Sequence, residues 1–475
     1  MTLSLSEKEE KLFRVLAAAA AESRVPAYVI GGFVRDKFLG RRTKDIDVVC
    51  IGDGIALAQA VAGKFASRPE VRFFKNFGTA QIKTEGVEIE FVGARKESYN
   101  PDSRKPNVLP GTLEDDQNRR DFTINALAFS LNEEDYGAIL DPFDGLLDLE
   151  DKIIRTPLQP EQTFSDDPLR MLRAIRFAAQ LDFRIELHCL EGISSQKDRL
   201  QIVSRERVAD ELNKIMMTPK PSTGFLLLKK TGLLDLLLPQ LTALSGVEYV
   251  DNKGHKDNFY HSLQVLDNIA PNTQNLWLRW AALLHDIGKA RAKKYEKGHG
   301  WTFHGHEVLS AKMVPKIFSH LKLPTGDKMD YVRKIISLHH RPISLTKENI
   351  TDSALRRLLF DAGEELEDLM ILCKADITSK NQEKKKRFQA NFNMVQQRLA
   401  EVEEKDRIRN WQPPVSGHEI METFGLTPSK EVGLIKTAIR EAILDGIIPN
   451  EHAAAHQFMI EQAAALGITP KNTAS

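Results

Sequence analysis

The sequence predicts an α+β protein of several domains, with a mixed sheet and its helices first and helices alone after it. Three observations support this prediction. The 475 residues suffice for about two to four domains. Two short apolar runs, 28–30 and 46–50, have the length and composition of strands. From residue 156 onward the apolar segments indicate helices, with a clear break at Pro413-Pro414.

Composition limits the partners and the compartment. The 66 basic and 66 acidic side chains cancel, which argues against indiscriminate binding to nucleic acid, and no DNA partner is expected. The alanines at 17–21 are too few to cross a membrane. The three cysteines lack disulfide-like or metal-ligand spacing, which is typical of a reducing compartment. We therefore expect a cytoplasmic protein with no membrane partner.

The first candidate site is a strand, a glycine turn and a helix in succession. Residues 28–30 form the strand and Gly31-Gly32 the turn. Glycine lets a phosphate approach the backbone N–H groups at such a helix start. Arg35 would then clamp a triphosphate, and Asp36 would orient the loop. The alternative is an ordinary connection with a surface arginine.

The next strand carries two carboxylates. Its alternation places Asp45 and Asp47 on one face, roughly 6.5–7 Å apart. Such a pair can hold two Mg²⁺ ions about 4 Å apart, which activate an attacking hydroxyl and stabilise a leaving pyrophosphate. The alternative is a solvated strand end. Glu88 and Glu90 share a face of a later strand; either could complete the metal site, and we predict Glu90 as the third catalytic carboxylate.

These motifs resemble the catalytic head of the tRNA nucleotidyltransferase and poly(A) polymerase family, which belongs to the polymerase-β-like nucleotidyltransferases. The segments that carry the resemblance are 31–36, 43–47, 119–126, 141–145, 166–177 and 204–212. The resemblance implies Mg²⁺ in the head, tRNA as acceptor, and CTP and ATP as donors. It also implies that Arg120 and Asp121 meet the ribose and phosphates, while Asn125 braces their loop.

Asp167 and Arg170 form a candidate base-reading pair. They lie three apart in a segment that we predict to be helical, so their side chains would be neighbours. An acceptor beside a donor matches the Watson–Crick edges of cytosine and adenine and rejects uracil and guanine, because each mismatched buried group costs about 1–3 kcal/mol. The alternative is a surface salt bridge.

Arg173 and Arg176 continue this spacing as an arginine stripe. Their expected partners are the triphosphate and neighbouring acidic residues. A solvated charged face is the alternative, and Arg176 fits it better than Arg173. Residues 100–111 are rich in proline and polar side chains and indicate a mobile loop. In the family such a loop is associated with the switch from C to A addition, so its presence favours complete C-C-A addition.

The second half carries histidines and aspartates in an order that resembles the all-helical HD phosphohydrolases. The positions that match the metal ligands of that superfamily are His261, His285, Asp286 and Asp376. Imidazole with carboxylate suits Mn²⁺, Ni²⁺, Fe²⁺ or Mg²⁺. Further positions that match a second ion or a phosphate are His306, His339 and His340. The alternative is that the domain survives mainly as a body that holds RNA.

Four domains follow from these motifs, and the resemblance is to the bacterial type of the family with a C-terminal HD domain. They are a nucleotidyltransferase head at 20–155, an all-α neck at 156–245, an HD domain at 250–380 and a helical tail at 381–475. The leading hypothesis is C-C-A addition to tRNA. Poly(A) polymerase and partial CC- or A-adding activity are alternatives within the class. A metal-dependent phosphohydrolase whose head only binds nucleotide is the alternative from another class.

Overall fold

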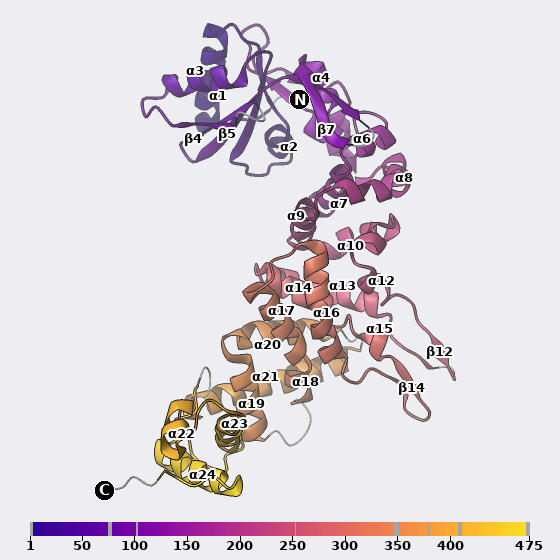
Figure 1. Cartoon of the computed structure of the whole chain (residues 1–475). Helices are drawn as coiled ribbons and strands as arrows, with labels where there is room; N and C mark the ends of the chain where they lie inside the picture. Colours follow the sequence, from indigo (N-terminus) through magenta and orange to yellow (C-terminus); the bar gives the residue numbers. More distant parts are fainter. Residues whose placement is uncertain are drawn as a thin grey trace. The chain divides into compact units, whose positions relative to one another are not determined.

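The computed structural model describes residues 3–74, 78–100, 103–251, 253–345, 351–378, 381–406 and 411–471. The chain divides into two compact units, Met1–Pro239 and Gln240–Ser475, called here the first and the second unit (Figure 1). The first unit contains a sheet with helices, and the second is largely helical. The α+β class predicted from the sequence is confirmed.

A seven-stranded mixed sheet forms the start of the first unit, in the order β3-β4-β5-β2-β1-β8-β9. Only the β2–β5 pair is parallel; its neighbours pair antiparallel. The strands are β1 (Ala27–Ile30), β2 (Asp45–Cys50), β3 (Val71–Phe74), β4 (Thr79–Thr84), β5 (Val87–Gly93), β8 (Ala128–Ser130) and β9 (Ile139–Leu140). The helices nearest the sheet are α1 (Glu7–Glu22), α2 (Gly32–Phe38) and α3 (Gly54–Lys64). Phe13 of α1 is fully buried between Phe33 and Phe129, which fixes α1 to the sheet.

The segment predicted as a loop at 100–111 is part of a hairpin. Strands β6 (Arg95–Asn100) and β7 (Ser103–Pro110) pair antiparallel and form a separate two-stranded sheet. Residues 101 and 102 lie outside the described part. The loop prediction is therefore wrong for 103–110. Prolines usually interrupt regular structure, but a strand with a partner on only one side tolerates proline.

Helices make up most of the remainder of the first unit. They are α4 (Leu113–Asn118), α5 (Gly145–Glu150), α6 (Pro160–Asp166), α7 (Leu169–Leu181), α8 (Leu187–Gln196), α9 (Arg205–Met216), α10 (Pro221–Lys230) and α11 (Leu233–Leu237), with a small parallel pair, β10 (Ile153–Ile154) and β11 (Arg184–Ile185). Helix α12 (Pro239–Thr242) contains the boundary between the two units. Helix α7 buries Leu172 and Ile175 on one side, while its arginines lie on the other. This orientation directs Arg173 and Arg176 toward the seven-stranded sheet.

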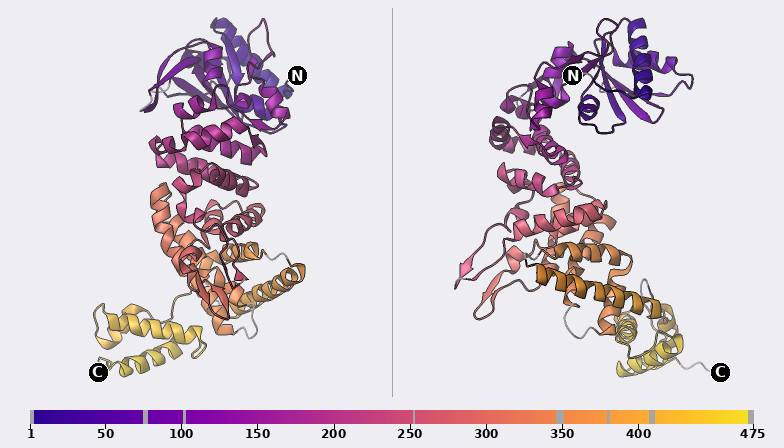
Figure 2. Two further views of the ribbon diagram at one scale, coloured as in Figure 1. Left: turned by 90° about the vertical axis from the view of Figure 1, so that its right-hand side faces the viewer. Right: turned by 180° about the vertical axis from the view of Figure 1, so that it is seen from behind.

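The second unit is helical apart from two hairpins that extend from it (Figure 2). Its strands are β12 (Tyr249–Val250), β13 (Lys253–Gly254), β14 (Lys294–Glu296) and β15 (Gly300–Thr302). Its main helices are α13 (Asn258–Ile269), α14 (Leu276–Leu284), α15 (Lys289–Ala292), α16 (His306–Leu321), α17 (Asp327–Leu338), α18 (His340–Ser344), α19 (Asp352–Ala362), α20 (Leu366–Asp376) and α21 (Gln382–Asp406). The last three are α22 (Gly417–Phe424), α23 (Lys430–Leu444) and α24 (His452–Ala465), which share a core of their own. Among the described residues no helix is long and apolar enough to span a bilayer.

Candidate functional site

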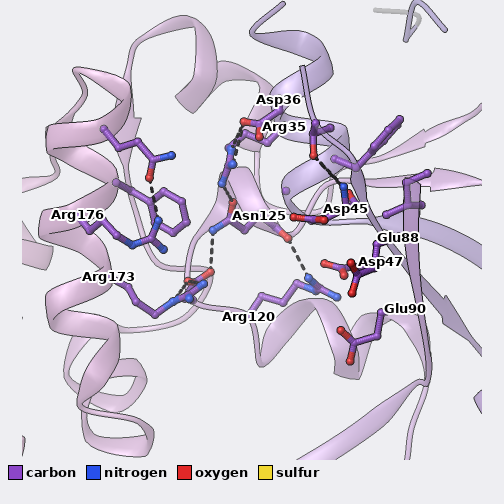
Figure 3. Close-up of a pocket in the computed structure, with 18 of the residues that line it drawn as sticks. Arg35, Asp36, Asp45, Asp47, Glu88, Glu90, Arg120, Asn125, Arg173 and Arg176 are labelled. Carbon is purple, nitrogen blue, oxygen red and sulfur yellow. Dashed lines mark hydrogen bonds and ion pairs between the residues drawn. The ribbon is translucent and has the colours of Figure 1, made fainter. Parts of the chain in front are cut away.

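Four carboxylates line one side of a pocket of about 670 Å³ in the first unit (Figure 3). The parallel register places Asp45 opposite Glu88 and Asp47 opposite Glu90. Because facing residues of paired strands point to the same side, all four carboxylates share one face of the sheet. The prediction that Asp45 and Asp47 lie on one face is confirmed. Arginine side chains of α7 line the opposite side of this pocket.

The surroundings of Glu88 and Glu90 differ. Glu88 accepts a hydrogen bond from Gln81 and pairs with Lys83 at 3.0 Å. Burial and the neighbouring Asp47 carboxylate raise the pKa of Glu90. Burial also raises the pKa of Asp47, although Arg120 opposes the effect. Two carboxylates that are costly to ionise side by side fit a divalent cation such as Mg²⁺, which would stabilise both charges.

Glu90→Gln should therefore reduce nucleotide transfer much more than Glu88→Gln. A lost metal ligand removes transition-state stabilisation, and each 1.4 kcal/mol corresponds to a factor of ten, so we expect a loss of at least about 10-fold for Glu90→Gln. Glu88→Gln keeps a hydrogen-bonding side chain beside Lys83 and should stay within about threefold of wild type. Initial rates with saturating Mg²⁺ measure both. Equal losses would show that the two glutamates share the role.

The glycine turn lies beside the carboxylates. Gly31 has φ +85°, ψ −134° and donates its N–H to the Leu127 carbonyl at 3.1 Å. A Cβ atom at this position would lie 2.9 Å from Arg120 Nη1 and 3.5 Å from Asp47 Oδ2. The backbone angle therefore favours glycine, and a Cβ at this position would also displace the guanidinium group of Arg120.

Gly31→Ala should lower the free energy of unfolding of the first unit by about 1–3 kcal/mol, the range for a strained backbone conformation. Gly32→Ala is the matched control, because a Cβ there meets nothing closer than Arg35 Nη2 at 3.7 Å. It should be neutral or slightly stabilising within α2. Chemical denaturation monitored by circular dichroism measures the difference. Similar destabilisation by both variants would contradict this account of the turn.

Arg35 is buried, so the alternative of a surface arginine is wrong. Its guanidinium pairs with Asp36 at 2.8 Å and donates to Asn125 Oδ1 at 2.7 Å. Asn125 in turn donates to Asp121 Oδ1 at 2.9 Å. Asn125 therefore braces this loop, as predicted. The orienting role given to Asp36 is consistent with its pairing to Arg35.

Asp121 connects this loop to α7. Arg173 donates to Asp121 Oδ2 through Nε at 2.7 Å and Nη2 at 2.6 Å. Burial alone would raise the pKa of Asp121, but Arg173 and Asn125 lower it to about 2. Arg176 is buried and pairs with Glu211 at 2.6 Å, so the solvated-face alternative is wrong for Arg176. Arg173 is half-buried and pairs with Asp121. The acidic partners predicted for the stripe are confirmed.

The stability advantage of wild type over Asp121→Asn should depend on pH. A depressed pKa stabilises the fold above the unfolded value near 4 and loses this effect as pH falls toward 2. Between pH 5 and pH 3 the difference in unfolding free energy should shrink by about 1 kcal/mol. Urea titrations of both proteins at the two pH values measure it. A difference that is independent of pH would contradict the assigned pairing.

Asp167 and Arg170 are not neighbours in the way predicted. Asp167 precedes α7 in an extended conformation, because the residue before proline avoids the helical region and Pro168 follows it. Its side chain accepts from Arg207 at 3.4 Å. Arg170 instead donates to the backbone carbonyls of Thr163 and Arg119. The prediction that the pair shares a helical face is wrong for this structure.

The histidines and aspartates predicted in the second unit converge on one cluster, in which His340 is exposed, Asp376 is half-buried and the other members are buried. His261 Nε2 lies 2.9 Å from Asp376 Oδ1 and 3.4 Å from Asp286 Oδ2. His285 Nε2 lies 3.3 Å from Asp286 Oδ2. On the other side, His306 Nε2 is 3.2 Å from Asp286 Oδ1. His339 and His340 complete a second group with His306.

The donor set of this cluster fits divalent ions. Among the described residues, the buried polar atoms without a hydrogen-bond partner include His285 Nε2, Asp286 Oδ1, His306 Nε2 and His339 Nε2. Such atoms are rare in folded proteins unless a ligand satisfies them. Sequence reasoning missed Lys289, whose Nζ lies 2.6 Å from Asp286 Oδ2. The spacing of three residues between Asp286 and Lys289, at the start of α15, could have indicated this ion pair.

Comparison with known proteins identifies the domains in which the two sites lie. Residues 27–155 match the Poly A polymerase head domain, residues 182–244 the probable RNA and SrmB-binding site of polymerase A, and residues 258–381 the HD domain. The A-adding tRNA nucleotidyltransferase of Deinococcus radiodurans is 31% identical over 430 residues, which cover 88% of this chain and 91% of that protein. The multifunctional CCA protein of Pseudomonas fluorescens is 34% identical over 309 residues, or 62% and 70%.

Solved structures share the fold. A complex of CCA-adding enzyme with ATP has a TM-score of 0.63 at 23% identity and covers 97% of this chain and 96% of its own. A tRNA nucleotidyltransferase complexed with a primer tRNA and an incoming ATP analog has a TM-score of 0.57 at 23% identity, covering 80% and 98%. The matching head and HD domains, together with the curated relatives, define a nucleotidyltransferase with an HD domain. The chain belongs to the tRNA nucleotidyltransferase family.

Proposed function

We propose that this protein adds C, C and A to the 3′ end of tRNA from CTP and ATP. The observation that carries the proposal is the pocket in which paired carboxylates of the sheet face the arginines of α7 (Figure 3). Asp45, Asp47 and Glu90 would hold Mg²⁺, which activates the terminal hydroxyl of the acceptor and stabilises the leaving pyrophosphate. No DNA partner is expected.

Arginines supply the charge that a triphosphate requires. Arg120 and Arg173 line the pocket with guanidinium groups, and Arg176 lies one turn further along α7. Each is held by a buried carboxylate: Arg120 by Asp116 and Arg173 by Asp121, as Arg176 is by Glu211. Preorganised guanidinium groups stabilise charge without reorganising during the reaction.

Base selection remains assigned to Asp167 and Arg170. Each of the two side chains has protein partners. To read a base, Asp167 would have to exchange Arg207, and Arg170 two backbone carbonyls, for groups of the base. With C or A, the amino group would donate to Asp167 and the ring nitrogen would accept from Arg170. With U or G, both half-buried side chains would face a mismatched group.

Addition of the terminal A alone is the second candidate function. It is favoured by the Deinococcus radiodurans relative, named as an A-adding enzyme, and by a similarly named protein of Aquifex aeolicus that is 46% identical over 159 residues, or 34% of this chain and 19% of that protein. The segment at 100–111, whose presence in the family favours complete addition, contains strand β7, which pairs with β6.

One assay separates these functions. Transcripts of one tRNA that end before CCA, after C, or after CC are incubated with each labelled nucleoside triphosphate singly and together. Complete addition predicts C on the first two and A on the third, without U or G. A-only activity predicts a product from the third transcript alone. Extension of an unstructured oligonucleotide by many A residues would instead indicate a poly(A) polymerase.

The second unit is inferred to hold divalent ions such as Mn²⁺, Ni²⁺, Fe²⁺ or Mg²⁺. The unpartnered buried atoms of its histidines support this inference. Ligands for one ion would be His261, His285, Asp286 and Asp376, with His306 and one of His339 or His340 for a second ion or a phosphate. Hydrolysis of a phosphoester there is a candidate activity of its own, independent of transfer in the first unit.

A further inference from the structure

Asp116 is a buried carboxylate beside the pocket, described so far only as the partner that holds Arg120. It lies on α4 and is 0% exposed. Oδ1 accepts from Arg119 Nε at 2.9 Å, and Oδ2 accepts from Arg120 Nε at 3.2 Å and Nη2 at 3.1 Å. Arg119 has a second carboxylate partner, Glu97, at 3.4 Å. Among the described residues, the ion-pair partner of the Arg120 guanidinium is Asp116.

The guanidinium nitrogen of Arg120 that does not contact Asp116, Nη1, points into the pocket. Nη1 donates to the Asn125 carbonyl at 3.4 Å and lies 2.9 Å from where a Cβ of Gly31 would be. The same Cβ position is 3.5 Å from Asp47 Oδ2. Nη1 and the Asp47 carboxylate therefore both lie close to the glycine turn, and Figure 3 shows Arg120 pointing toward Asp47. A triphosphate that reaches from the turn to the metal ligands has to pass this point.

The charges around Arg120 explain why Asp116 is needed in addition to Asp47. The positive charge of Arg120 lowers the pKa of Asp47, whereas the negative charge of Asp116 raises it. A long guanidinium side chain without Asp116 would take Asp47 as its nearest anionic partner. Such a pair would occupy the oxygen needed by a metal ion and remove Arg120 from the phosphates.

We propose that Asp116 is a positioning residue for nucleotidyl transfer, which holds Arg120 toward the incoming triphosphate and away from Asp47. The proposal rests on the transfer function given above. It predicts a defect in the use of both CTP and ATP, because the triphosphate is common to them. It also predicts a raised requirement for Mg²⁺, which a merely structural role of Asp116 would not produce.

The test compares Asp116→Asn with Asp115→Asn in the full-length protein. Asp115 is adjacent and closes the capping box of α4 with Thr112, so its variant controls for damage to the helix. Asp116→Asn should lower kcat/KM for CTP and for ATP by at least about 10-fold and raise the half-saturating Mg²⁺ concentration severalfold. The KM for tRNA should not change. Asp115→Asn should leave all these values near wild type.

A double-mutant cycle identifies the residue through which Asp116 acts. In an Arg120→Gln background no guanidinium is left to pair with Asp47, so adding Asp116→Asn should cost nothing further, and the Mg²⁺ requirement should return to the wild-type value. Additive losses in the cycle would overturn the proposal. An Asp116→Asn variant that melts at the wild-type temperature and has an unchanged Mg²⁺ requirement would also overturn it. If wild type transfers no nucleotide, the proposed function fails; Mg²⁺-dependent CTP binding by the same variants then decides on Asp116 separately.

Discussion

Asp45→Asn and Asp47→Asn are each expected to lower nucleotide addition by at least about 1,000-fold, since a lost metal ligand removes several kcal/mol of transition-state stabilisation. Both side chains face the pocket from β2, and Asp47 lies directly opposite Glu90. Asparagine keeps the shape and removes the charge that binds Mg²⁺. Single-turnover incorporation of labelled nucleotide into tRNA is the measurement, because it separates the transfer step from release of the product.

Asp53→Asn is the matched control for these variants. Asp53 follows the same strand and caps α3 by accepting from the Ile55 and Ala56 N–H groups. Asparagine caps a helix about as well as aspartate, so stability and addition should both persist. Addition at near wild-type rate in either Asp45→Asn or Asp47→Asn would refute the catalytic assignment.

The second large effect concerns Asp286 in the second unit. Its Oδ2 lies within 3.4 Å of His261 and His285 Nε2, and its Oδ1 lies 3.2 Å from His306 Nε2, so this one carboxylate joins both candidate ion positions. Asp286→Asn should weaken binding of Mn²⁺ by about 100-fold or more, and any hydrolysis of phosphoesters should be lost with it. Nucleotide addition should remain, because its ligands lie in the first unit.

Metal binding to the second unit can be isolated by measuring it in an Asp45→Asn, Asp47→Asn background, which removes the head site. Calorimetric titration with Mn²⁺ then compares Asp286→Asn with Asp330→Asn, an exposed aspartate of α17 paired with Arg333. The control should bind as well as its parent. Retained Mn²⁺ affinity in Asp286→Asn would contradict the site, whereas loss of addition without unfolding would show that the metal also organises the tRNA platform.

Local patterns account for what the sequence could predict. The strand, glycine turn and helix around Gly31, and the alternation around Asp45 and Asp47, depend on neighbours within a few residues, and the structure confirms them. The burial of Arg176 could not be predicted in this way, because its partner Glu211 is 35 residues away. A charge pattern on one helix does not reveal a carboxylate supplied by another.

Two other differences come from proline and from pairing. The helical assignment of Asp167 overlooked the constraint that Pro168 places on the residue before it. The hairpin β6–β7 was missed because a polar, proline-containing segment gains strand character only from its partner. The role of each residue in the two sites stays a prediction until the variants above are measured.

The contacts of Asn125 restrict how the first unit can move. Arg35 of α2, Asn125, Asp121 and Arg173 of α7 form an unbroken series of hydrogen bonds of 2.6–2.9 Å. Bonds to charged groups contribute about 1.5–3 kcal/mol each, so separating α2 from α7 is costly. Helices α2 and α7 should therefore move together as one rigid part. A movement that closes the pocket around a nucleotide should take place elsewhere in the chain and leave the distance between these two helices unchanged.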